Sequence, residues 1–261
     1  MMKNKQQFKY LYGPVSSWRL GRSVGIDLIS RKTKQCSFDC TYCQLGRNEN
    51  VTLTRQVFVP TTAVIAELKS FPAKDFEYYT FSGTGEPTLA KNIGPLIKWL
   101  KHNTDKQVAV LTNSTTIMRA DVRKALLPAD VVVLKFDAGT ETVFKHINHP
   151  AKGVTFTGII RGIQIFRKIY RGKLAVQLMF VPENVGEAKI MVNLVKTFHA
   201  DEVQVNTPLR PSGAMPLPKK VLLNLKKMFG TRAISAYDKI KPRVKPVDTK
   251  SALFRRGKRL K

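Results

Sequence analysis

The sequence contains few cysteines, few carboxylates and no long apolar run. Three of its 261 residues are cysteines, an odd number that does not build the disulfide framework of a small secreted domain. No apolar stretch approaches the roughly 18 uncharged residues that a membrane-spanning helix needs. The basic N-terminal residues lack the apolar stretch of a signal peptide. We therefore expect a cytoplasmic protein that does not bind membranes.

Because carboxylates are scarce, the chain is strongly basic. Its 18 Asp and Glu residues face 45 Lys and Arg residues, which gives a formal net charge of +27. Residues 219–261 alone contain 15 basic and 2 acidic side chains. Such a field attracts polyanions, and nucleic acid is the commonest polyanion in the cytosol. A solvated basic surface without a partner is the alternative interpretation of the same charge.

All three cysteines lie within eight residues. Cys36, Cys40 and Cys43 have CxxxCxxC spacing, and three thiolates can bind three irons of a 4Fe-4S cluster while the fourth iron stays open to another ligand. Structural zinc is the main alternative, because Cys3His sites bind zinc readily. The nearest histidine in the sequence is His102, so a zinc site would need a ligand from a distant segment.

Apolar runs rich in β-branched residues alternate with longer helical patterns, which predicts an α/β fold. Six strands joined by right-handed crossovers predict a partial (βα)6 TIM-like barrel. The predicted strands are Val24–Ser30, Tyr78–Gly83, Gln107–Ser114, Val131–Ala138, Leu174–Val181 and Glu202–Pro208, and the predicted helices between them are Thr61–Phe71, Ile93–Asn103, Ala120–Leu127, Val154–Tyr170 and Glu187–Ala200. Continuous apolar strands of this kind are typical of a parallel sheet that is buried on both faces.

The expected barrel occupies residues 1–211. It includes a cluster loop at 31–60, which is far longer than the usual connection of about 2 to 6 residues and contains the cysteines. Beyond Pro208 the alternation stops in the sequence. Residues 212–261 are therefore predicted to be a basic C-terminal extension, with a helix at Lys219–Phe229 and a tail that is mobile or folds only on a partner.

Polar residues follow the predicted strands, at the end of the barrel where such folds carry their reacting groups. The second strand leads into Ser82-Gly-Thr-Gly-Glu-Pro87, whose glycines let the backbone approach a ligand beside a carboxylate. Asn113, Asp137 and Asn206 end later strands. Each is also a common helix cap, but together they predict a binding site, in which Asp137 offers an exposed carboxylate to a ribose diol.

These motifs resemble the radical S-adenosylmethionine (radical SAM) superfamily. CxxxCxxC with Tyr42 before the last cysteine, together with the Gly-Glu-Pro turn, is similar to the cluster and SAM motifs of its members. The segments Tyr12–Asp27, Cys43–Gly46, Ser82–Leu89 and Asn206–Pro211 are similar to iron-sulfur oxidoreductases related to the wyosine-type tRNA-modifying enzymes. In the superfamily the open iron binds SAM, and reductive cleavage releases a 5′-deoxyadenosyl radical.

The resemblance implies a role for individual residues. By position, Cys36, Cys40 and Cys43 would bind the cluster, Tyr42 would lie near the adenine, the backbone at Thr84, Gly85 and Glu86 would hold the methionine amino group, Asn113 and Asp137 would contact its carboxylate or the ribose, and Arg19, Arg22 and Arg210 would lie near the substrate. A flavodoxin-like protein is the electron donor that the resemblance implies.

The sequence departs from the family pattern in two respects, the residue at position 84 and the number of cysteines. Thr84 stands where many members have glycine, which a backbone contact tolerates. No further cysteine exists for the second cluster expected of wyosine-forming enzymes, so that reaction is not transferred. We expect a radical SAM enzyme that modifies RNA, with tRNA as the expected substrate. An activase that makes a glycyl radical in a partner protein is one alternative, although Gln35 replaces the glycine usual there. A basic RNA-binding protein with a structural metal is the non-enzymatic alternative.

Overall fold

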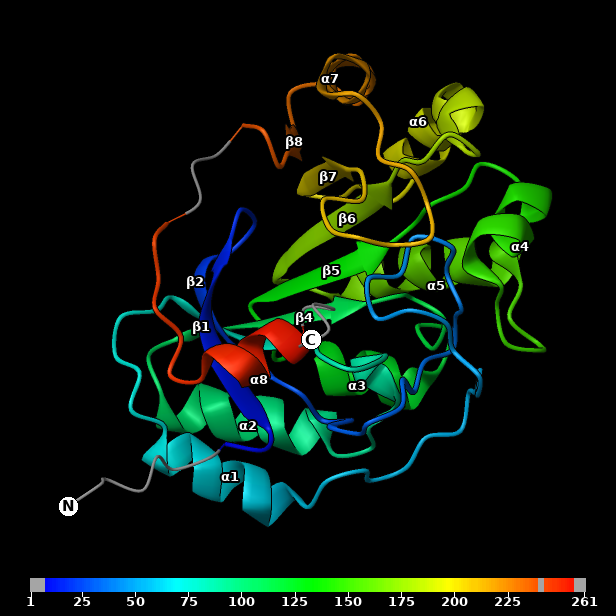
Figure 1. Cartoon of the computed structure of the whole chain (residues 1–261). Coiled ribbons are helices and arrows are strands. Elements are labelled where there is room, and N and C mark those ends of the chain that lie inside the picture. Colours follow the sequence, from blue (N-terminus) through cyan, green and yellow to red (C-terminus); the bar gives the residue numbers. More distant parts are fainter. Residues whose placement is uncertain (1–7, 239–241, 256–261) are drawn as a thin grey trace.

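A computed structural model describes residues 8–238 and 242–255, which form one curled sheet with helices along its outer side (Figure 1). The strands lie in sequence order: β1 (Leu11–Ser17), β2 (Gly21–Ile26), β3 (Tyr78–Phe81), β4 (Gln107–Thr112), β5 (Val131–Lys135), β6 (Lys173–Met179), β7 (Glu202–Asn206) and β8 (Ala233–Ser235). Strands β1 and β2 are antiparallel, and each pair from β2 to β8 is parallel. The sheet is an incomplete TIM-like barrel, which confirms the predicted fold.

Helices follow most of the parallel strands and cover the outer face of the sheet. They are α1 (Thr61–Ser70), α2 (Ile93–Asn103), α3 (Ala120–Leu126), α4 (Glu141–Asn148), α5 (Phe156–Ile169), α6 (Ala188–Lys196) and α7 (Lys219–Met228), with short 3-10 turns at Pro87–Leu89 and Val185–Glu187. The short helix α8 (Thr249–Phe254) instead contacts β1. Helix α5 shows why they form: Ile159, Ile163 and Phe166 recur at helical spacing and are buried. The side chain of Thr155 caps its first turn by accepting from the Gly158 amide. Among the described residues, no helix is both long and apolar enough to cross a bilayer.

Strand β5 shows how the sheet is buried on both faces. Val132 and Leu134 belong to the main core between sheet and helices, whereas Val131 and Val133 pack with Leu20 in a smaller cluster inside the barrel. Each fully buried side chain of this size contributes about 1.5 to 3 kcal/mol. The apolar run therefore serves two cores at once, as a buried parallel strand requires.

The N-terminal edge of the sheet was not predicted. No strand was predicted at residues 11–17, which contain Gly13 and Pro14, two residues that are unusual inside a strand. An edge strand tolerates both, and the pairing of β1 with β2 shifts its register between Tyr12 and Val15. Helix α4 was missed as well. The first predicted strand, Val24–Ser30, begins three residues late and ends four residues late.

The prediction that the alternation stops at Pro208 is wrong. Strand β8 pairs in parallel with β7, and Leu222 and Leu225 of α7 belong to the main core. Helix α8 lies beside β1 (Figure 1), so the expected mobile tail is ordered through 242–255. Residues on both sides of the predicted boundary at 211 therefore share one sheet and one core. The cations of the tail from Arg256 to Lys261 lie outside the described residues.

Candidate active site at the mouth of the half-barrel

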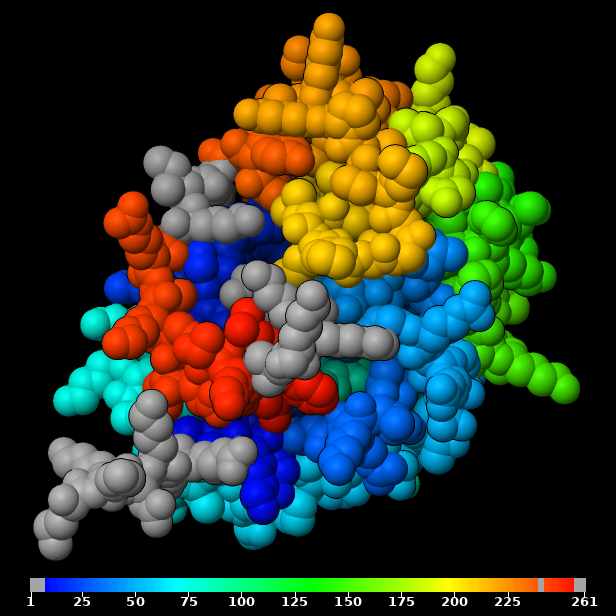
Figure 2. Space-filling view, in the orientation of Figure 1, coloured from blue at the N-terminus to red at the C-terminus, as the bar shows by residue number. Residues whose placement is uncertain are grey.

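A cavity of about 430 Å³ lies inside the half-barrel, at the carboxyl ends of the parallel strands. Its walls come from the cysteine loop (residues 31–60), from the inner faces of β1 to β7 and from the segment that follows β7. Figure 2 shows the cysteine loop in blue, the segment after β7 in yellow and α8 in red meeting on one face of the molecule. All three cysteines line the cavity. A cavity that is partly open to solvent therefore lies where the sequence predicts a binding site.

The cysteine loop is fastened to the barrel on two sides. On one side it forms a parallel bridge with the Gly-Glu-Pro turn, through Gln35 and Gly85. On the other side, the amides of Asp39 and Thr41 donate to the carbonyl oxygens of Asn148 (3.0 Å) and Ile147 (2.9 Å) at the end of α4. These contacts fix the backbone around the cysteines, although the loop itself contains no helix or strand among the named elements.

Two asparagine side chains reach the thiols, one from the segment after β4 and one from the end of α4. The Nδ2 group of Asn113 lies 3.4 Å from the Sγ of Cys36, and that of Asn148 lies 3.3 Å from the Sγ of Cys40. Amide N–H groups directed at sulfur suit a thiolate, because they stabilise its negative charge. Asn113 was predicted at the site, whereas Asn148 was not, because it lies in the unpredicted helix α4.

Burial favours the protonated form of two of the three thiols. It raises the pKa of Cys36 to about 12 and that of Cys40 to about 11. A metal therefore has to displace these protons when it binds. Among the described residues, no three Cys, His, Asp or Glu side chains are grouped to hold one metal ion, and no histidine lines the cavity. Three separate thiols suit a cluster, in which each cysteine binds its own iron.

The turn after β3 approaches the cysteine loop at van der Waals distance. A Cβ atom at Gly85 would lie 1.8 Å from the carbonyl oxygen of Gln35, so only glycine fits there. The same carbonyl accepts from the amide of Glu86 at 3.0 Å, and the amide of Gln35 donates to the carbonyl of Thr84 at 3.3 Å. The backbone at 84–86 is thus placed beside Cys36. The Thr84 side chain points away from the cavity and donates to Asp27.

Glu86 lines the cavity, but its carboxylate is occupied by protein groups. It is buried, and it accepts from the Thr112 hydroxyl at 2.7 Å, the Asn113 amide at 2.6 Å, and the amide and hydroxyl of Thr88 at 2.9 and 2.6 Å. Burial raises the pKa of Glu86, and these hydrogen bonds act in the opposite direction. The side chain therefore joins the turn to the end of β4, and its contact with SAM stays a prediction.

The expectation that Asp137 presents an exposed carboxylate is wrong. The residue is 3% exposed, and it does not line the main cavity. Its oxygens accept from the Tyr42 hydroxyl, from the Met179 amide at 2.8 Å and from Asn148 at 3.2 Å, and Lys135 lies 3.6 Å away. Asp137 therefore anchors Tyr42, which does line the cavity next to Cys43. Burial is also the main reason why the pKa of Tyr42 is raised.

The three predicted substrate arginines separate in space. Arg19 and Arg210 line the cavity. Arg22 does not, because its guanidinium bonds to Glu77 at 2.6 and 2.9 Å outside the lining, so a substrate role for Arg22 is not supported. The guanidinium of Arg19 lies 4.4 Å from the centroid of the Trp18 ring. Burial and the nearby charge of Arg210 lower the pKa of Arg19 to about 10.

Further polar groups face the same space without a protein partner. The buried atoms Arg19 Nε, Asn206 Oδ1 and Ser16 Oγ have no hydrogen-bond partner among the described residues, and all three side chains line the cavity. Four cations line it, namely Arg19, Lys135, Arg210 and Arg255, against the single carboxylate of Glu86 among the described residues. Cations therefore outnumber carboxylates in the lining, and two of them lie against the cysteine loop: Lys135 lies 4.8 Å from the centroid of the Tyr42 ring, and Arg210 donates to Gln44 at 2.6 Å.

The chain is similar in sequence to a curated relative and in fold to two solved structures. A UPF0026 protein of Synechocystis sp. is 41% identical over 205 residues, which are 78% of this chain and 77% of that relative. The structure of TYW1 with a lysine-pyruvate adduct bound has a TM-score of 0.58 at 16% identity and covers 80% of this chain and 72% of its own. SuiB of Streptococcus suis bound to the precursor peptide SuiA has a TM-score of 0.55 at 15% identity, over 70% and 38% of the two chains. At these identities the two solved structures show a common fold.

The family comparison covers the part of the chain that builds the site. The model of the radical SAM superfamily matches residues 30–195, from the cysteine loop to the end of α6. This match contains the three cysteines, the Gly-Glu-Pro turn and both asparagines that reach the thiols. The chain is therefore an enzyme of the radical SAM superfamily.

Proposed function

We propose that this enzyme binds a 4Fe-4S cluster through Cys36, Cys40 and Cys43, cleaves SAM and acts on RNA, with tRNA as the substrate class. When bound, the cluster and SAM supply a 5′-deoxyadenosyl radical that abstracts hydrogen from the substrate. The observation that carries the proposal is the cavity itself, which is lined by all three thiols and by four cations. The residues present suit the cluster, because sulfur is its ligand and amide donors accompany two of the thiols.

The chain positions and shields the reacting groups. The backbone at 84–86 is held beside Cys36 by its hydrogen bonds to Gln35, where it can bind the amino group of SAM. Tyr42, fixed by Asp137 and Asn148, closes the cavity behind Cys43. A position inside the half-barrel would limit the contact of the reacting groups with bulk water, which would protect a reactive carbon radical from side reactions.

RNA is favoured because exposed cations occur in the segments after strands whose ends line the cavity, in addition to the four cations in the lining. Exposed cations follow the carboxyl ends of β2 and β7; Arg31, Lys32, Arg47, Lys219 and Lys220 form this basic rim. Cations that neutralise phosphates supply most of the sequence-independent affinity for nucleic acid. The similarity of the sequence motifs to wyosine-type tRNA-modifying enzymes supports tRNA among the RNA classes. Arg19 and Arg210 would then contact the nucleotide that enters the cavity.

Binding of tRNA at several salt concentrations tests the RNA proposal. Changing Lys32, Arg47 and Lys220 to Gln should weaken binding, and each lost phosphate contact should lower the slope of log K against log salt by about 0.7 to 0.9. A control variant changes Lys69, Lys98 and Lys124 to Gln, which are exposed on the outer helices α1, α2 and α3. Point substitutions are preferable to deletion of residues 219–261, because that deletion would remove α7 and β8 from the fold. Equal affinity and slope in both variants would contradict RNA binding at the rim.

Anaerobic reconstitution tests the cofactor. About four irons per chain and release of 5′-deoxyadenosine from SAM under a strong reductant are expected, whereas one zinc per chain and no cleavage would establish the structural-metal alternative. We further propose that the protein is cytoplasmic and that a flavodoxin-like protein donates the electron. Mass spectrometry of tRNA nucleosides from a strain without the gene would identify the modified position. Unchanged tRNA together with active SAM cleavage would favour a protein substrate, as in the glycyl-radical activase alternative.

A further inference from the structure

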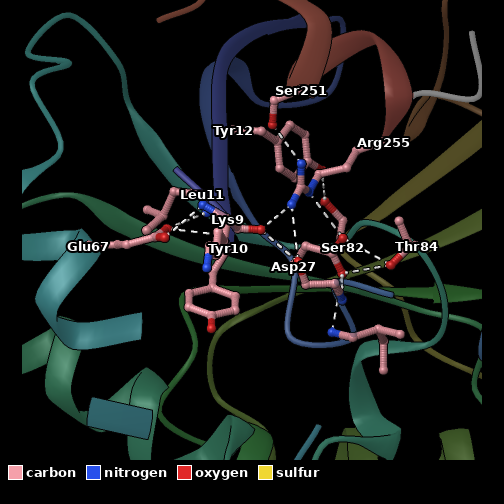
Figure 3. Close-up of polar contacts among 12 residues, drawn as sticks. Lys9, Tyr10, Leu11, Tyr12, Asp27, Glu67, Ser82, Thr84, Ser251 and Arg255 are labelled. Carbon is pink, nitrogen blue, oxygen red and sulfur yellow. Dashed lines mark hydrogen bonds and ion pairs between the residues drawn. The ribbon is translucent and has the colours of Figure 1, made fainter. Parts of the chain in front are cut away.

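Arg255, directly after helix α8, reaches across the molecule to the base of the cavity. The residue is 8% exposed and is one of the lining residues. Its Nε donates to Asp27 Oδ2 at 3.1 Å, its Nη1 to the Ser251 hydroxyl at 2.6 Å, and its Nη2 to the Ser30 hydroxyl at 3.2 Å and to the Lys9 carbonyl (Figure 3). Because a guanidinium has five N–H donors, these four bonds leave it little capacity to bind a ligand directly.

Asp27 transmits this contact to the turn after β3. Its carboxylate is almost completely buried and accepts from the Thr84 hydroxyl at 3.0 and 3.2 Å. It also lies against the backbone of the turn, because a Cβ atom at Gly83 would be 2.3 Å from its carboxyl carbon. The amides of Ile29 and Ser30 donate to the same carboxylate. The position of Asp27 therefore sets the position of Gly83 and Thr84.

Tyr12 provides a second connection between Arg255 and the turn. The guanidinium carbon of Arg255 lies 5.5 Å from the centroid of the Tyr12 ring, and the Tyr12 hydroxyl forms a hydrogen bond of 2.8 Å with Ser82 (Figure 3). The ring lies directly over Gly25, where a Cβ atom would be 2.1 Å away from it. Arg255 is thus linked to both Ser82 and Thr84, the two residues that flank Gly83.

Helix α8 depends on these contacts for its own position. It has six residues, too few for a helix to be stable in water without tertiary packing. Its other anchors in this region are the buried Ala252 and the hydrogen bond of 2.7 Å from the Val247 amide to the Gly13 carbonyl. Removing the guanidinium would leave the Asp27 carboxylate buried without its counter-charge, which is costly.

We infer that Arg255 is a positioning residue for SAM: through Asp27 and Tyr12, the C-terminal helix holds the Ser82–Glu86 turn in the geometry that binds the methionine part of SAM. This inference rests on the proposed function, because it takes that turn as part of the SAM site. Coupling between two sites is reciprocal. SAM binding must therefore also stabilise the docked position of α8. The coupling requires no direct contact between α8 and SAM.

SAM affinity of the reconstituted enzyme tests the inference. Arg255→Gln should weaken SAM binding about tenfold, the lower range for loss of a supporting contact behind a first ligand. Iron per chain should be unchanged, and the rate of 5′-deoxyadenosine release at saturating SAM should stay within about twofold. Arg255→Lys keeps the charge but not the planar fork, so it should restore part of the affinity. Arg167→Gln, which removes an ion pair of 2.9 Å with Asp201 on the outer face, is the matched control and should bind SAM normally.

Hydrogen exchange supplies a readout that a purely structural role would not change. Amides of α8 in the wild-type protein should exchange more slowly when SAM is added, and this protection should be lost in Arg255→Gln. Equal SAM affinity in Arg255→Gln and wild type, or no response of α8 to SAM, would overturn the inference while leaving the proposed function intact. Failure of the wild type to bind SAM would instead overturn the proposed function. If Arg255→Gln does not fold, Arg255→Lys and Ser251→Ala give the same comparison with milder changes.

Discussion

The contact between Gly85 and Gln35 makes Gly85→Ala the most direct test of how the site is built. The added Cβ would lie 1.8 Å from the Gln35 carbonyl oxygen. Real contacts of this kind stay above 3.0 Å, so the oxygen would have to retreat by about 1.2 Å, the difference between these two distances. Both partners are backbone, so no side-chain rotation relieves the clash. The turn and the cysteine loop would have to separate.

The magnitude follows from what this separation breaks. Two backbone hydrogen bonds join the segments, at 3.0 and 3.3 Å, and each contributes about 0.5 to 1.5 kcal/mol. Overpacking adds about 1 to 3 kcal/mol. Gly85→Ala should therefore lower the free energy of unfolding by about 2 to 6 kcal/mol. Because Gln35 precedes Cys36, the iron content after reconstitution should fall as well.

Urea denaturation of the apo protein and iron analysis of the reconstituted protein measure the two effects. Gly186→Ala is the matched control, because a Cβ atom there has no neighbour within 4 Å and the residue does not have a positive φ. It should behave as wild type in both measurements. A Gly85→Ala protein with a stability loss below about 1 kcal/mol and full iron content would refute the close contact between turn and loop.

Two further predictions concern the thiols. Asn148→Ala removes the amide donor 3.3 Å from Cys40 and should make the midpoint potential of the cluster more negative by about 40 mV, equivalent to one hydrogen bond of about 1 kcal/mol; a redox titration followed by EPR measures this, and an unchanged potential would contradict the contact. In the apo protein, the folded pKa values of about 12 for Cys36 and about 11 for Cys40 exceed the 9.0 of an exposed thiol, so the unfolded chain loses these protons first as pH rises. The free energy of unfolding should therefore fall from about pH 9 upward, and a variant with Ala at all three cysteines should show a smaller fall in denaturation experiments over this range.

Short-range patterns were sufficient for the barrel and for the cysteine loop. Strand β5 could be predicted because a run of valines buried on both faces is a local signal, and helix α2 was predicted with its observed limits because its amphipathic pattern is regular. Strand β1 could not be predicted in this way, because a Gly-Pro pair is tolerated at the edge of a sheet but would disrupt an inner strand. Helix α8 has six residues, and its apolar contacts exist only once β1 is in place.

In the candidate site, too, residues within local motifs were predicted, whereas contacts between distant segments were not. The cysteines, the Gly-Glu-Pro turn and Asn113 were predicted from motifs, and the structure brings them together around one cavity. Asp137 shows the limit of such reasoning: a carboxylate after a buried strand looks available in the sequence, but Tyr42 and Met179 occupy it in the fold. Arg22 was misplaced for a related reason, because the sequence does not show that Glu77 lies beside it.

The sequence by itself determined which residues are candidate cluster ligands, because three cysteines that lie within eight residues need only a turn of backbone to converge on one site. Only the tertiary structure decided how that chemistry is supported. Arg255 and Asp27 are 228 residues apart, and nothing in the neighbourhood of either residue predicts that they form a buried pair. Their contact exists because the sheet curls and the chain returns to its first strand, which makes burial of both charges together less costly than burial of either alone.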